Sequence, residues 1–295
     1  MKRTCLYGVS VAVLAATVLA GPASGAHIAY NDCVYWAGSP AATPPHPTIQ
    51  PNVTVYGIGT RPTGFGGGQY SPTSGLLKDF STGQTFGVTA TFTQNGGVNW
   101  QPGEAPAPGT GGLDCATGTD ADKWFGPDTA SLCGTIYYGS SSGWWVDLTF
   151  TGLNPNKLYT FVTTANRNGS TYVGSSARNT KYVISDIAGF VSNDSSVGTI
   201  KATTTIANDT TVFNTGYNTV NGYVARWSYI NPGPDGDFTV RANWAGAAYG
   251  GDTTSPGKAY AFDAFCLIEE VPEPATLAIF GMGGLAILRR RWRTR

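Results

Sequence analysis

The segment 85–93 constrains the fold most, because apolar residues occupy every second position along it. The apolar positions are Phe86, Val88, Ala90 and Phe92, and threonines fill most of the positions between them. A period of two places alternate side chains on opposite faces of a β-strand. The segment therefore predicts a strand with one face buried and a hydroxyl-rich face toward solvent.

Similar short segments recur along the chain and are separated by turn residues such as Asn-Gly, Asn-Pro and Gly-Gly. No segment of useful length between residues 27 and 270 has a helical period. Many short strands without helices are typical of an all-β, antiparallel β-sandwich of the jelly-roll kind. Further strands are predicted at 27–36, 53–58, 134–138, 143–150, 158–165, 181–184, 197–206, 222–229, 236–242 and 258–269. Residues 146–162 are expected to form a hairpin.

The N-terminus has the pattern of a secretory signal peptide. Lys2 and Arg3 precede an apolar stretch over 5–20, and small residues lead to Ala26. We expect an N-terminal helix over this region, export by the Sec machinery and cleavage by signal peptidase after Ala26. The domains are then a signal peptide at 1–26, a β-sandwich with long loops at 27–270 and a C-terminal segment at 271–295.

The C-terminal segment combines three elements: Pro272-Glu273-Pro274, an uncharged apolar run over 275–288 and an arginine-rich end. The prolines prevent regular structure from running straight through. The apolar run predicts a short hydrophobic helix, shorter than the roughly 20 residues that span a bilayer. Arginines at one end place that end in the cytoplasm, so the rest of the chain lies outside.

This arrangement resembles the PEP-CTERM sorting signal of bacterial exported proteins. The resemblance implies recognition of Pro272, Glu273 and Pro274 by an exosortase-type transpeptidase, a membrane enzyme. It also implies transient anchoring in the inner membrane, followed by transfer to the cell envelope or the extracellular matrix. The alternative is an ordinary C-terminal membrane anchor.

The formal net charge of zero conceals an acidic body. The two ends contain seven of the 18 basic residues but one of the 18 acidic residues. The body retains 11 basic and 17 acidic residues, a formal charge of −6. An acidic exported domain without a basic stripe argues against a nucleic-acid partner.

Four cysteines remain after removal of the signal peptide, and an even number in an oxidising compartment predicts disulfides. Three connectivities are open. We expect Cys115–Cys133, which closes a local loop, and Cys33–Cys266, which ties the first strand to the last. The alternative is four buried thiols.

The segments 153–165, 236–241 and 259–269 resemble strands of galactose-binding-like or carbohydrate-binding-like jelly rolls. That resemblance implies a last strand beside the first and a sugar or calcium site at loop ends or on a sheet face, but it transfers no binding residue. Aromatic faces stack on sugar rings. Trp144 and Trp145 should face opposite ways. The candidate ligand-contacting residues are Trp124, Trp145, Trp244 and Tyr249, with core packing as the alternative.

A cluster of aspartates, Asp114, Asp120, Asp122 and Asp128, could supply oxygen ligands to calcium, although solvated turn residues have the same pattern. No other cofactor is expected. No pair of carboxylates and no nucleophile motif identifies a catalytic site. The sequence therefore predicts a non-catalytic surface or matrix protein associated with extracellular polysaccharide. The alternatives are a lectin-like carbohydrate-binding module and a polysaccharide-active hydrolase or lyase.

Overall fold

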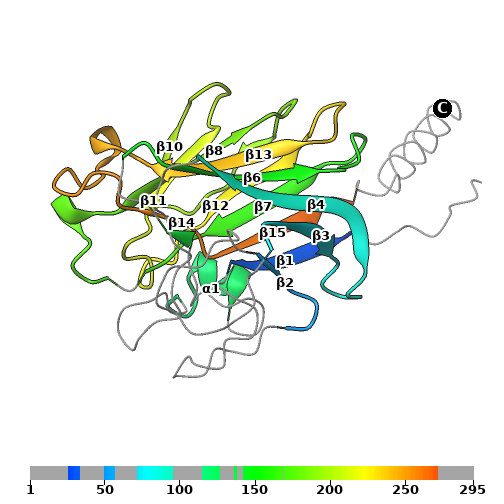
Figure 1. The fold of residues 1–295 in the computed structure, drawn as a ribbon, viewed down its shortest axis with the longest axis horizontal. Helices are drawn as coiled ribbons and strands as arrows, with labels where there is room; N and C mark the ends of the chain where they lie inside the picture. The colour runs from blue at the N-terminus through cyan, green and yellow to red at the C-terminus, as the bar shows by residue number, and fades with distance from the viewer. Residues whose placement is uncertain are drawn as a thin grey trace, which may run out of the picture.

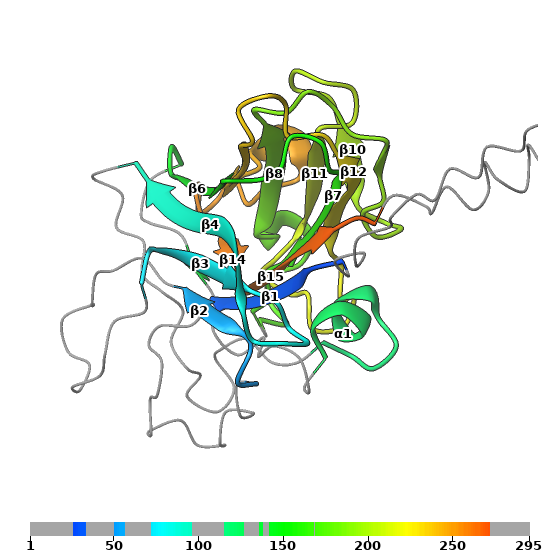
Figure 2. The ribbon, with the colours of Figure 1, turned by 90° about the vertical axis from the view of Figure 1, so that its right-hand side faces the viewer.

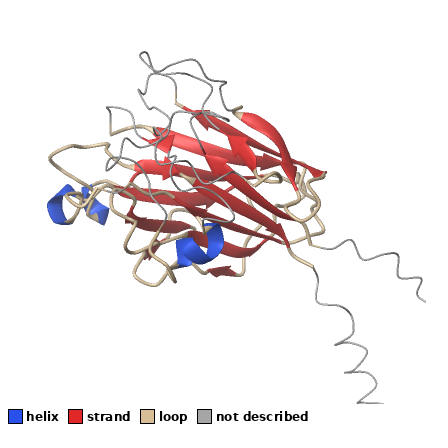
Figure 3. Cartoon of the chain, turned by 90° about the horizontal axis from the view of Figure 1, so that it is seen from below, coloured by secondary structure: helices blue, strands red, loops and turns tan. Residues whose placement is uncertain are grey.

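The computed structural model describes residues 26–33, 50–56, 72–95, 115–126, 136–137, 142–167 and 169–271. Nearly all regular structure in these residues is β-strand (Figure 3). The strands are β1 (Ile28–Cys33), β2 (Thr54–Tyr56), β3 (Ser74–Lys78), β4 (Thr85–Gln94), β5 (Ile136–Tyr137), β6 (Trp145–Thr151), β7 (Tyr159–Thr164), β8 (Asn179–Ser185), β9 (Ser192–Asn193), β10 (Ile200–Ala202), β11 (Thr210–Asn214), β12 (Ala225–Ile230), β13 (Phe238–Trp244), β14 (Tyr260–Phe262) and β15 (Ala264–Glu269). The helical pieces are α1 (Asp120–Phe125), η1 (Gly174–Ser176) and η2 (Ala247–Tyr249).

The strands form a β-sandwich, as the sequence predicts (Figure 1). One sheet has the order β2-β1-β15-β7-β12-β9, and the other has the order β10-β11-β8-β13-β6-β4-β3. A small third sheet pairs β14 with β5. Every pair is antiparallel except β1 with β2. The two layers are seen end-on in Figure 2.

An aromatic core fills the space between the two large sheets. Phe150 of β6 lies at its centre, with ring centroids 4.8 Å from Phe238, 5.6 Å from Phe161 and 5.8 Å from Phe265. Edge-to-face and tilted contacts of this kind suit the quadrupoles of aromatic rings. The strand predicted from alternation is confirmed as β4, because Val88, Ala90 and Phe92 are buried and the threonines between them face outward.

A second apolar cluster covers the outer face of the six-stranded sheet. Ala121 and Phe125 of α1 pack there against Val162, Ala264 and Cys266. Figure 2 shows α1 beneath β1 and β15. The helix begins where Thr119 accepts a hydrogen bond from the Asp122 backbone N–H, a standard N-cap. The expectation of a body without helices is wrong at this point, because six residues are too few for a detectable helical period.

The predicted hairpin over 146–162 is wrong, because its two strands belong to different sheets of the sandwich. β6 pairs with β4 and β13 in one sheet, whereas β7 pairs with β12 and β15 in the other. The connection over 152–157 therefore crosses between sheets. Gly152 has a φ of 78°, and a Cβ there would lie 2.8 Å from the Gly87 carbonyl oxygen. A larger residue would be strained, so this glycine makes the crossover possible.

The strand predicted at 197–206 is also placed wrongly. β10 covers only Ile200–Ala202, and the longer strand β11 follows at Thr210–Asn214. The carboxylate of Asp209 accepts backbone N–H bonds from Thr204, Thr205 and Ile206, which forms a turn and ends the extended segment. The side chain responsible lies after the turn, so a local pattern does not reveal it.

The last strand lies beside the first, as expected, but the expected Cys33–Cys266 disulfide is wrong. Ile28 is opposite Ile268 and Asp32 is opposite Ala264. Cys33 faces the core between the sheets, and Cys266 faces the cluster beneath α1. Both are free, buried thiols on opposite faces of one sheet, so they cannot be bridged.

Candidate functional site

The open outer face of the seven-stranded sheet carries one of the predicted tryptophans. Trp145 begins β6 and is opposite Asn243 of β13. Trp144 is buried and donates its indole N–H to the Gly257 carbonyl. Trp145 points the other way and is half-buried, and its backbone N–H is held by Asn95 Oδ1 at 3.1 Å. The prediction that the two tryptophans face opposite ways is confirmed.

A charged pair lies next to Trp145 on the same face. Asp147 and Arg241 are opposite each other in the β6–β13 register. The Arg241 Nε donates to Asp147 Oδ1 at 2.6 Å, and Nη2 donates to Oδ2 at 2.7 Å. The guanidinium carbon also lies 4.5 Å from the centroid of the Trp145 ring. Hydrogen bonding to Asp147 raises the pKa of Arg241, so the stacked cation keeps its charge.

Hydroxyl groups occupy this face on the β4 side of Asp147, whereas Lys181 and Val183 of β8 lie on the other side of Arg241. Thr149 and Thr239 share a hydrogen bond of 2.9 Å across β6 and β13, and Ser74 and Thr91 share one of 2.7 Å across β3 and β4. We use "Trp145 face" for Trp145, Asp147, Arg241, Asn243 and the outward threonines Thr89, Thr91, Thr93, Thr149 and Thr239. The Trp145 ring could stack on a sugar ring, and the neighbouring ion pair and threonine hydroxyls could form hydrogen bonds with sugar hydroxyl groups.

The other predicted aromatic residues do not join Trp145. Trp124 lies on α1 at the opposite outer face, where the Arg226 guanidinium carbon is 5.2 Å from its ring centroid. Trp244 faces inward at the end of β13 and packs against the core. Tyr249 is half-exposed in η2, and its carbonyl accepts a hydrogen bond from Asn179.

The predicted calcium ligands are partly outside the described residues, because Asp114 and Asp128 fall there. Asp122 accepts the Gly118 N–H at 2.7 Å, and Asp120 pairs with Lys123 at 3.6 Å. Within the part of the chain that the structure describes, no group of three or more acidic, histidine or cysteine side chains could hold a metal. Calcium binding stays a prediction.

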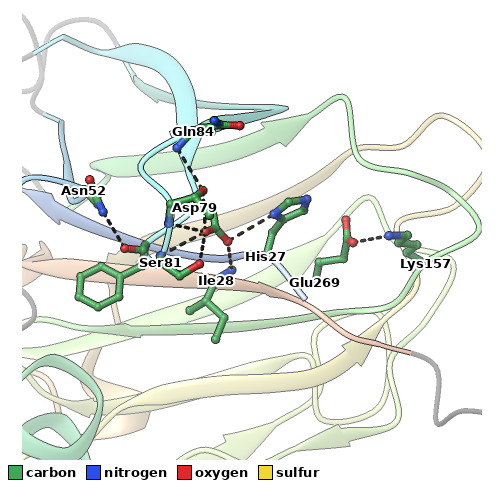
Figure 4. A network of polar contacts seen from close by, with 10 residues as sticks. His27, Ile28, Asn52, Asp79, Ser81, Gln84, Lys157 and Glu269 are labelled. Atoms are coloured by element: carbon green, nitrogen blue, oxygen red, sulfur yellow. Dashed lines mark hydrogen bonds and ion pairs between the residues drawn. The ribbon is translucent and has the colours of Figure 1, made fainter. Parts of the chain in front are cut away.

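The end of the sandwich at which β1 begins and β15 ends has its own polar network (Figure 4). Asp79 accepts hydrogen bonds from the backbone N–H groups of Ser81 and Thr82 and contacts His27 Nδ1 at 3.3 Å. Burial of Asp79 by itself raises its pKa, but the hydrogen bonds from Ser81, Thr82 and His27 outweigh burial and hold the pKa well below its usual range. The His27 ring also stacks on Phe86 at 4.7 Å.

Sequence reasoning missed a buried arginine–tyrosine cluster at the other end of the sandwich. Arg167 and Arg178 both donate to the hydroxyl of Tyr260, Arg167 at 2.9 Å. The Arg178 guanidinium carbon lies 3.3 Å from the centroid of Tyr172. Burial raises the pKa of Tyr260 to about 12, although both arginines oppose the shift. Arg167, Tyr172 and Arg178 lie in the connection between β7 and β8, whereas Tyr260 begins β14 more than 80 residues later, so no local pattern in the sequence marks the cluster.

The remaining predicted residues are the cysteines Cys115 and Cys133 and the sorting motif at 272–274. Cys115 is buried, and its sulfur donates to the Asn218 carbonyl at 3.5 Å. Cys133 lies outside the described residues, so the Cys115–Cys133 pairing stays a prediction. Pro272, Glu273 and Pro274 lie outside them too, directly after the described chain. Between residues 26 and 271, no described helix has the length and apolar composition needed to cross a bilayer.

Comparison with known families identifies one part of the chain. Residues 270–293 match the PEP-CTERM protein-sorting motif. The chain therefore carries the C-terminal signal of an exported protein that is processed by an exosortase-type system. The body has no comparable match, either among curated proteins or among solved structures.

Proposed function

We propose that this chain is a non-catalytic protein of the cell surface or extracellular matrix that associates with exopolysaccharide through the Trp145 face. The observation that carries the proposal is the position of the sorting motif. Its match begins at residue 270, one residue after β15 ends at Glu269. The sorting signal is thus attached directly to a strand near the centre of the six-stranded sheet, and the sandwich is the part that sorting delivers.

The structural roles of five described carboxylates support a non-catalytic protein. Asp147 is engaged by Arg241, and Glu269 by Lys157. Asp79, Asp209 and Asp252 each accept backbone N–H groups of their own turns. Hydrogen bonds from Thr254 and Ser255 keep the pKa of Asp252 low despite its burial. The pKa values of Asp79 and Asp209 are likewise lowered by hydrogen bonds, and carboxylates held ionised in this way are poor general acids at neutral pH.

The Trp145 face supports polysaccharide as the partner. The Arg241 guanidinium stacks on the Trp145 ring and restricts its motion, so the Trp145 side chain loses little conformational entropy when a sugar ring stacks on it. The outward threonines offer donors and acceptors along neighbouring strands, which suits a linear polymer better than a single small ligand.

The sorting part of the proposal is tested by deletion of residues 271–295. We expect the truncated protein to leave the envelope fraction and to appear freely in the medium. Fractionation unchanged by the deletion would contradict exosortase-type sorting.

The polysaccharide part is tested by Trp145→Ala in co-sedimentation with exopolysaccharide of the producing cells. Loss of one stacking ring should remove about 1.4 kcal/mol of binding free energy, which corresponds to a tenfold weaker Kd. Tyr229→Ala is the matched control, since Tyr229 is an exposed aromatic on β12 of the other sheet. Equal binding by both variants would exclude the Trp145 face.

The same assay addresses the alternatives. Sedimentation is measured with calcium and then with chelator, and loss of binding on chelation would support calcium at the aspartate cluster over 114–128. Soluble sugar is measured throughout, and its release would favour the hydrolase or lyase alternative over a binding protein.

A further inference from the structure

The two ends of the sandwich body leave it side by side. β1 and β15 are neighbours in the six-stranded sheet (Figure 1), and the Glu269 N–H donates to the His27 carbonyl at 2.8 Å. The next residue, Glu270, donates its N–H to the Leu158 carbonyl at 2.8 Å. The expected signal-peptidase site before His27 and the start of the sorting motif are therefore one hydrogen bond apart across two strands.

Neither end has a spacer between the folded body and its processing signal. Pro272 follows Glu270 by two residues, and an extended residue advances at most about 3.6 Å, so the motif begins within about 7 Å of the paired strand. The strand is held to its end by a hydrogen bond of 2.6 Å from Thr160 to Glu270 and by the Lys157–Glu269 ion pair. At the other end, Asp79 contacts the His27 ring (Figure 4), and Phe86 stacks on it.

This end of the molecule, the tether pole, is formed by His27, residues 269–271 and the turns over 79–84, 152–157 and 231–237. The turns belong to it because Tyr159 is opposite Glu269, and Leu153 donates its N–H to the Gly236 carbonyl. Trp145 and Asn243 lie at the other end of β6 and β13, the distal pole. Seven-residue strands separate the two poles by roughly 20 Å.

We propose that the bilayer surface is the partner of the tether pole while the C-terminal tail is in the membrane, so that the Trp145 end of the sandwich points away from the cell. This orientation rests on the proposed sorting function, and it follows from the short connection. Residues 271–274 connect Glu270 to the apolar run that begins at Ala275, and these five steps span at most about 18 Å. The body cannot bring its distal pole to the membrane on this connection, because the connection would have to span more than the roughly 20 Å of strand that separates the two poles.

The connection, rather than adhesion, holds the pole at the membrane. Leu158 and Val271 are exposed apolar residues beside the exit of the chain, but the acidic residues Asp235 and Asp237 lie on the neighbouring turn. Acidic side chains are repelled by anionic headgroups. A body without the tail is therefore expected not to bind vesicles that contain phosphatidylglycerol.

The test places a fluorophore at each pole of the exported chain with its tail intact. Asn156→Cys and Thr253→Cys are both in exposed turns, the first at the tether pole and the second at the distal pole. Each variant is labelled with bimane and reconstituted in phosphatidylglycerol vesicles containing headgroup-nitroxide lipid, with the unsubstituted chain as labelling background. We expect several-fold stronger quenching at residue 156 than at residue 253. Equal quenching, or stronger quenching at 253, overturns the orientation.

Two further measurements separate the causes. Vesicle flotation reports the anchor: a chain that does not float overturns the membrane tether of the proposed function together with the orientation, whereas floating with equal quenching overturns the orientation alone. An inserted Gly/Ser linker of about 20 residues between Glu270 and Val271 has a reach of roughly 25 Å. We expect it to abolish the difference between the two sites, and a difference that persists would overturn the role of the short connection.

Discussion

The outer faces of the two sheets differ although both come from alternating strands. On the six-stranded sheet the outward residues Val162, Ala264 and Cys266 are apolar, and α1 covers them with Ala121 and Phe125. On the seven-stranded sheet the outward residues of β4, β6 and β13 are mostly threonines, together with Trp145, Asp147 and Arg241. All of them except the buried Asp147 remain half-buried or exposed. Alternation thus determines that each strand has two faces, whereas the residues on the second face determine whether it becomes core or surface.

Under the proposed function, the difference also separates the residues that stabilise the fold from those that bind the ligand. The covered face contributes apolar burial, and each large side chain buried there stabilises the fold by about 1.5–3 kcal/mol. The open face contributes little to stability because its ion pair and hydroxyl groups are partly hydrated. Substitutions should therefore reduce stability on the covered face and ligand binding on the open face.

The largest expected contrast is in thiol reactivity. Cys266 is buried under α1, which blocks access of a reagent, and burial also raises the pKa of its thiol, which keeps the reactive thiolate scarce. A cysteine introduced on the open face by Thr93→Cys should react about a thousandfold faster with a maleimide, since Cys266 reacts mainly after local opening. Labelling followed by peptide mass spectrometry measures both rates. Comparable rates would mean that α1 does not cover Cys266.

Phe125→Ala should be the most destabilising single change on the covered face. It removes a fully buried ring and leaves a cavity, for a cost of about 3–5 kcal/mol. Urea unfolding of the exported chain measures it. Lys123→Ala, on the exposed side of the same helix, is the control and should cost under about 0.5 kcal/mol. A Phe125 effect as small as the control would remove α1 from the core.

Asp79→Ala tests the junction of the two sheets, where Asp79 of the β3–β4 turn holds His27 before β1. The change leaves backbone N–H groups without their acceptor and should cost about 1–3 kcal/mol at neutral pH. Because the folded-state pKa of Asp79 is lowered, its contribution is present above a pH of about 4 and is lost as the pH falls further.

The measurement for Asp79 is the free energy of unfolding as a function of pH. The wild-type chain should lose stability relative to Asp79→Ala below a pH of about 4, so that the two curves converge. Asp235→Ala removes an exposed carboxylate from another turn of the same pole and should leave the curve nearly unchanged. Parallel curves for wild type and Asp79→Ala would exclude the proposed linkage.

Arg241→Ala should reduce stability less than Phe125→Ala or Asp79→Ala, by about 1 kcal/mol, because the pair with Asp147 is bidentate but the Arg241 side chain is 47% exposed. Arg241→Lys keeps the charge and loses the planar fork, so it should recover only part of this loss. Urea unfolding at low and high salt measures both variants. A cost above about 3 kcal/mol would place the open face in the structural core and weaken the comparison.

The sequence by itself determined the all-β class, the export pattern and the sorting signal, because each of these is written in contiguous residues. The strand at 85–94 is one example, since its burial follows from a period of two. The opposite orientations of Trp144 and Trp145 are another, because neighbours on a strand must face opposite ways. The adjacency of the first and last strands also followed, from the jelly-roll resemblance.

Only the tertiary structure decided which sheet each strand joins and what covers each face. It moved β7 away from β6, placed Cys33 and Cys266 on opposite faces, and brought Arg167 and Arg178 to Tyr260. These contacts join residues far apart in the chain, and their formation depends on loop closure and packing rather than on local periodicity. The same long-range pairing of β1 with β15 places the two ends of the described body, His27 and Glu270, at one pole of the molecule.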